Sequence, residues 1–116
     1  MNEEKEITKI LMELGTPCHL AGYDLIRQAV VIMLNNEKNK ANGYIYRQLA
    51  ENVGKTQSQV ERNIRHAIEV TFYDIRPEMA KKYFGNSVGY NKVKPCNAQF
   101  LATIAEHTKN KELYTE

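Results

Sequence analysis

The chain has 116 residues, of which 42% are hydrophobic and 26% are charged, and its formal net charge is +2. This composition excludes an intrinsically disordered chain, and the length suits one domain with a modest core. No apolar run approaches the roughly 20 residues of a membrane span, and the acidic start Met-Asn-Glu-Glu-Lys is unlike a signal peptide. We therefore expect a cytoplasmic protein in which residues 1–116 form one domain.

Two helices are predicted in the first third of the chain. The first covers residues 2–14, where apolar residues recur at helical spacing, and Gly15 followed by Pro17 ends it. The second covers residues 22–35 and is apolar over more than half of its circumference, which is typical of a central helix. The polar, Asn-rich residues 36–43 then predict a surface loop.

The window of residues 46–65 predicts two further helices joined by a tight turn. Ala50, Gly54 and Val60 have the spacing of a helix-turn-helix. The motif needs a small residue where the helices cross, a glycine with positive φ after the first helix, and an apolar residue facing the crossing. The sequence Thr-x-x-Gln from Thr56 predicts a capping box at the start of the second helix.

The second helix of this window, expected over residues 57–73, has two different faces. Its predicted buried stripe consists of Val60, Ile64, Ala67, Ile68 and Thr71. Its opposite face carries the candidate DNA-contacting residues Ser58, Gln59, Glu61, Arg62, Arg65 and His66. Arg can bond the guanine edge, Gln the adenine edge and Glu the cytosine amino group, and recognition helices place their first turns in the major groove. A solvated helix with a charged outer face is the alternative interpretation.

Two more helices are predicted towards the carboxy terminus. The first covers residues 77–84 and has Pro77 at its first position, where a missing N–H costs nothing. The last covers residues 96–110, and the loop before it contains Lys92 and Lys94. No convincing strand is found, so the predicted class is all-α, with about six helices that include a helix-turn-helix.

The two cysteines indicate neither a metal site nor catalysis. Cys18 and Cys96 lack a Cys-x-x-Cys pattern or a spaced pair of histidines, so we expect no metal, no cofactor and reduced, largely buried thiols. Cys96 and His66 are the one thiol–imidazole combination to consider, and no local motif supports a nucleophile there. We therefore expect that the chain is not an enzyme.

Three stretches of the sequence carry a family resemblance. The longest is residues 60–70, Val-Glu-Arg-Asn-Ile-Arg-His-Ala-Ile-Glu-Val. The second runs from Ile7-Thr8 through Leu14-Gly15, Pro17 and His19 to Gly22-Tyr23, and the third is Lys92-Val93-Lys94-Pro95 with Asn97 and Phe100. With these residues the chain resembles the carboxy-terminal DNA-binding effector domain of the sporulation master response regulator, stage-zero sporulation protein A, of endospore-forming bacteria.

The resemblance implies an all-helical domain that binds a short element in double-stranded promoter DNA and regulates transcription. By position, it implies DNA contacts from Gln59, Glu61, Arg62, Arg65 and His66, with Glu61 and Arg62 reading bases, Ser58 and Arg65 touching phosphate, and Lys92 and Lys94 near the DNA backbone. It also implies a homodimer on tandem sites, associated through the last helix. The segment after the recognition helix would contact the RNA polymerase sigma factor.

The chain departs from the family pattern at four places. Gln59 stands where well-known members carry Arg, the loop after Asn36 is shorter and more polar, and residues 73–84 differ considerably. We also expect no receiver domain in residues 1–116, which leaves no phosphoacceptor pocket. The alternative function is a protein-interaction or anti-activator module that keeps the fold without reading DNA, and the salt dependence of DNA binding distinguishes the two.

Overall fold

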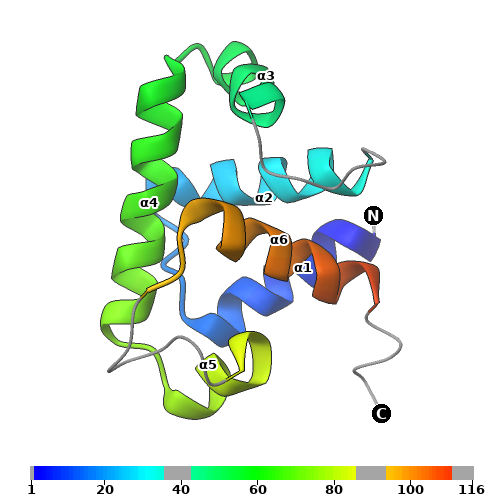
Figure 1. Ribbon diagram of the computed structural model, residues 1–116, viewed down its shortest axis with the longest axis vertical. Helices are drawn as coiled ribbons and strands as arrows, with labels where there is room; N and C mark the ends of the chain where they lie inside the picture. The colour runs from blue at the N-terminus through cyan, green and yellow to red at the C-terminus, as the bar shows by residue number, and fades with distance from the viewer. Residues whose placement is uncertain (1, 36–42, 86–93, 111–116) are drawn as a thin grey trace.

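The computed structural model describes residues 2–35, 43–85 and 94–110, and within these ranges the chain forms helices and no strand. The helices are α1 (Asn2–Leu14), α2 (Ala21–Leu34), α3 (Gly43–Val53), α4 (Gln57–Tyr73), α5 (Pro77–Phe84) and α6 (Asn97–Lys109). This arrangement confirms the predicted all-α class with about six helices (Figure 1). Most predicted bounds hold within one residue, and α3 begins at Gly43, ahead of the predicted window.

Local chemistry sets the ends of α1 and α3. Gly15 and Gly54 adopt φ values of 88° and 69°, in the left-handed region that glycine tolerates best. The Thr16 N–H donates to the Leu11 carbonyl at 3.0 Å, and the Lys55 N–H donates to the Ala50 carbonyl at 3.1 Å. Both bonds are the six-to-one bonds of a Schellman-type helix end, so each chain reversal satisfies a carbonyl that the helix would leave unpaired.

Helix α2 is the centre of the fold, as its broad apolar surface predicts. It packs against α1, α3, α4 and α6. In Figure 1, α2 crosses the middle of the molecule while α4 forms one edge of it. The buried residues of α2 are Gly22, Tyr23, Leu25, Ile26, Ala29, Val30 and Met33. Burial of this surface on four sides fixes the other helices relative to one another.

The contact between α2 and α4 depends on a glycine. A Cβ atom added at Gly22 would lie 2.2 Å from the Asn63 carbonyl oxygen and 2.8 Å from the Ala67 Cβ atom, both on α4. Atoms of this kind do not approach so closely, so the two helices can have this separation only when no side chain is present. Gly22 therefore sets the distance between α4 and the central helix.

The carboxy-terminal end of α4 is held by aromatic and hydroxyl contacts. The ring of Phe72 meets the rings of Phe84 and Phe100 edge-on, with centroids 5.3 Å and 6.2 Å away. Buried Thr16 and Thr71 share a hydrogen bond of 2.8 Å between their hydroxyl groups. The Thr71 hydroxyl also lies 2.7 Å from the Ala67 carbonyl oxygen, to which it donates. These contacts attach α5, α6 and the connector after α1 to the last turns of α4.

One expectation about the thiols was wrong, because both Cys18 and Cys96 are exposed. Cys18 lies in the connector between α1 and α2, and Cys96 immediately precedes α6. The prediction used the general preference of cysteine for the interior, and the position of each residue in a surface connection overrides that preference.

Several predictions lie outside the described residues. The predicted loop at residues 36–43 is described only at Gly43, and Lys92 falls in the undescribed range 86–93. Among the described helices, none combines the length and the apolar character that are needed to cross a bilayer.

Candidate nucleic-acid interface

The amino-terminal end of α4 is closed by the predicted capping box. The Gln59 backbone N–H donates to the Thr56 hydroxyl oxygen at 3.1 Å, and the Thr56 backbone N–H donates to the Gln59 side-chain oxygen at 2.9 Å. Two amide groups at the helix start are thereby paired. The Gln59 side chain thus caps the helix through its oxygen, while its NH2 group keeps donor capacity for a ligand.

The two faces of α4 are as the sequence predicts. The predicted buried stripe, Val60, Ile64, Ala67, Ile68 and Thr71, is buried in full. The predicted contact residues on this helix, Ser58, Gln59, Glu61, Arg62, Arg65 and His66, are all exposed. In the part of the chain that the structure describes, neither Arg62 nor Arg65 forms an ion pair. Both guanidinium groups are therefore open to an external acceptor.

Three helices hold this face of α4 in position. Helix α2 supports it at Gly22, and α3 also packs against α4. Helix α6 reaches it through Asn97, whose Nδ2 atom donates to the Glu61 carbonyl oxygen at 3.0 Å. In Figure 1 the amino-terminal end of α6 accordingly lies beside α4.

The Asn97 side chain also hydrogen-bonds Tyr46 on α3. Burial raises the pKa of Tyr46 above its ordinary value of 10.0, and the hydrogen bond with Asn97 opposes that rise. The phenol is therefore neutral at physiological pH and takes part in this contact as an uncharged group. Tyr46 and Asn97 were not predicted as site residues, because a contact between side chains so distant in sequence leaves no local pattern.

The exposed Lys94 lies three residues before Asn97, so the structure places it close to the second turn of α4. Three residues of chain reach about 10 Å at most. Lys94 is thus brought to the same region as the predicted contacts on α4, whereas its predicted neighbour Lys92 lies outside the described residues.

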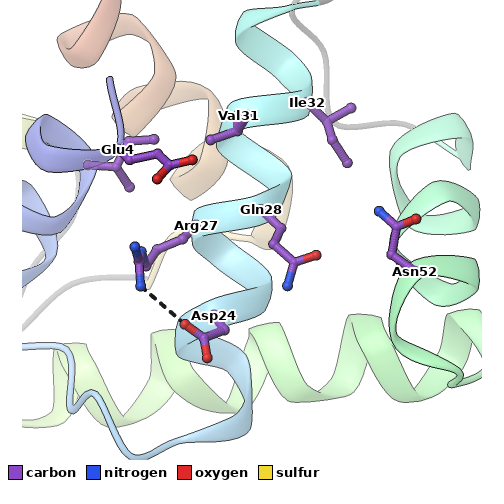
Figure 2. A pocket seen from close by; sticks show the side chains of 8 residues that line it. Glu4, Asp24, Arg27, Gln28, Val31, Ile32 and Asn52 are labelled. Carbon is purple, nitrogen blue, oxygen red and sulfur yellow. Dashed lines mark hydrogen bonds and ion pairs between the residues drawn. The ribbon is translucent and has the colours of Figure 1, made fainter. Parts of the chain in front are cut away.

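A recess with a volume of about 350 Å³ lies elsewhere, between α1, α2 and α3 (Figure 2). Gln28 on α2 and Asn52 on α3 face the same space, and Arg27 donates to Asp24 at 3.3 Å. None of the predicted DNA-contacting residues lines this recess. Within the described ranges, no three His, Cys, Asp or Glu side chains gather as a metal ion requires.

Comparison with protein families identifies the kind of domain. A family model described as "Sporulation initiation factor Spo0A C terminal" matches residues 7–108, which is most of the chain. The chain belongs to this family. The Spo0A C-terminal family consists of DNA-binding domains that regulate transcription in sporulation, and it is not a family of enzymes. The matched range contains α4 and every predicted DNA-contacting residue.

Proposed function

We propose that residues 1–116 form one sequence-specific DNA-binding domain of a transcription regulator, in which α3 and α4 act as a helix-turn-helix. Helix α4 would enter the major groove, whose width admits an α-helix. The observation that carries this proposal is the exposed polar face on the first turns of α4, where Arg62 and Arg65 have no ion pair among the described residues. This helix lies at an edge of the molecule, where a duplex can reach it (Figure 1).

The proposed roles follow from the chemistry of each side chain. Glu61 and Arg62 read base edges, since a carboxylate accepts from cytosine and a guanidinium bonds guanine bidentately. Arg65 and Ser58 contact phosphates on either side, and Lys94 contacts the DNA backbone beyond the helix. Gln59 and His66 add donors at the edges of this surface, and Lys92 belongs to the same proposed set.

The proposal is tested by fluorescence anisotropy with two labelled duplexes. One is a short duplex that the wild-type chain enriches from a randomised library, and the other is a scrambled duplex of the same composition. We expect Arg62→Ala to cost about 1–3 kcal/mol on the enriched duplex and little on the scrambled one. Lys94→Ala should weaken both and reduce the salt slope by about 1. Lys9→Ala, an exposed cation on α1, is the charge-matched control.

Two results would contradict the proposal. Equal losses on both duplexes for Arg62→Ala would show that this side chain does not read bases. Absence of any binding at low salt, where phosphate contacts are strongest, would favour the interaction module that keeps the fold without reading DNA.

The remaining partners are proposed on the same basis. Two copies would associate on tandem sites through α6, whose carboxy-terminal end lies on the far side of the molecule from α4 (Figure 1). Contact with the RNA polymerase sigma factor would involve residues 73–84, where Tyr73 is 81% exposed beyond the proposed DNA-contacting turns. The domain would act in the cytoplasm, where bacterial promoter DNA is.

A further inference from the structure

The Asn97 contact joins three helices through one side chain. Asn97 is the first residue of α6, and its Nδ2 atom donates to the Glu61 carbonyl oxygen at 3.0 Å. That carbonyl belongs to the second turn of α4, so this bond is additional to the regular bonding of the helix. The same side chain hydrogen-bonds Tyr46 on α3. Loss of this amide would therefore free α3, α4 and α6 from one shared constraint.

The Asn97 contact lies between two groups with different proposed roles. Glu61 and its neighbour Arg62 would read bases, and Lys94, three residues before Asn97, would hold the DNA backbone. Backbone contacts fix the register of a protein on the duplex, and base contacts specify the sequence. Correct base contacts therefore require a fixed geometry between Lys94 and the second turn of α4.

We propose that Asn97 is a positioning residue for sequence discrimination, because its amide fixes the second turn of α4 relative to the Lys94 segment. This inference rests on the proposed function. Hydrogen bonds to base edges keep their strength over a few tenths of an ångström, whereas charge attraction to phosphates changes slowly with distance. A small displacement of α4 therefore lowers affinity for the preferred sequence and leaves binding to other sequences almost unchanged.

The fold itself does not depend on this contact. Phe100 on α6 is fully buried and meets Phe72 on α4, with ring centroids 6.2 Å apart. Asn97 is only partly buried, and its hydrogen bond to α4 lies at the surface. Because apolar packing holds α6 on α4, Asn97→Ala should fold, and its effect on DNA binding can be measured directly.

The test compares Asn97→Ala, Tyr46→Phe and the double variant in the full chain, with the enriched and scrambled duplexes described above. One net hydrogen bond corresponds to a factor of about five in an equilibrium. We expect Asn97→Ala to bind the enriched duplex about fivefold more weakly, with unchanged binding to the scrambled duplex and an unchanged salt slope. The double variant should lose no more than Asn97→Ala, because both substitutions remove one network. Gln99→Ala, which removes an exposed amide from the same turn, is the matched control.

Three outcomes would overturn this inference. A lower melting temperature with an unchanged ratio of the two affinities would make Asn97 a stabilising contact only. An equal loss of affinity for both duplexes would show that Asn97 contributes to contact with the DNA backbone. A wild-type chain without preference for any duplex would remove the proposed function as well, and the wild-type measurement alone identifies that case.

Discussion

Substitution of Gly22 by alanine tests whether α2 and α4 approach as closely as described. The added Cβ atom would lie 2.2 Å from the Asn63 carbonyl oxygen, so that backbone must retreat by about 1 Å to reach ordinary contact distance. Overpacking of this kind typically costs about 1–3 kcal/mol, while alanine gains up to about 1 kcal/mol over glycine in helix propensity. Because rigid backbone opposes the new atom, we expect a net loss of about 2 kcal/mol.

Urea denaturation followed by circular dichroism measures this loss. With a typical slope, the midpoint of Gly22→Ala should fall by about 1 M relative to the wild type. Gly43→Ala is the matched control, because Gly43 is also helical and nothing lies within 4 Å of an added Cβ atom. Its midpoint should stay the same or rise slightly. A midpoint for Gly22→Ala at or above the wild-type value would refute the reasoning, since helix propensity alone would then decide the outcome.

Three further predictions concern single sites. Thr56→Ala removes the capping box and should cost about 1 kcal/mol in thermal denaturation; an unchanged melting temperature would refute that role. The hydrogen bond from Tyr83 holds the pKa of Glu13 below its ordinary 4.5. The ionised Glu13 carboxylate therefore stabilises the fold above about pH 4.5, and this stabilisation is lost as the pH falls through the lower folded-state pKa. The Glu13→Gln variant should accordingly lose less stability on acidification than the wild type. Cys18 and Cys96 are exposed, so both should react with a thiol reagent in the folded chain, and protection of either would contradict its exposure.

The helices were predictable because their signals are local. The capping box at Thr56, the left-handed glycine after α3 and the proline that opens α5 each act within one turn of chain. The buried and exposed faces of α4 likewise follow from helical spacing. The candidate DNA-contacting residues on α4 could therefore be chosen from the sequence, and the structure places all of them on the exposed face.

Contacts between distant segments were not predictable in this way. Gly22 has no special φ and lies near the start of a helix, and only the backbone of α4 opposite explains why a glycine is there. Asn97 could be predicted as a helix-start residue, but its bond to Glu61 depends on how α6 packs. Cys96 lies in the surface connection just before α6, so the preference of the residue type alone gave the wrong answer for its exposure.

The length of α4 makes it a lever arm. Arg62 and Thr71 are nine residues apart, which corresponds to about 13 Å along the axis. A tilt of about 5° with its pivot at Thr71 moves Arg62 by about 1 Å, which exceeds the tolerance of a hydrogen bond. A small change in the volume of the side chains packed around Phe72 would thus produce a larger displacement of Arg62, where DNA would be read. Mutations in the aromatic cluster of Phe72, Phe84 and Phe100 should therefore alter specificity without touching the duplex.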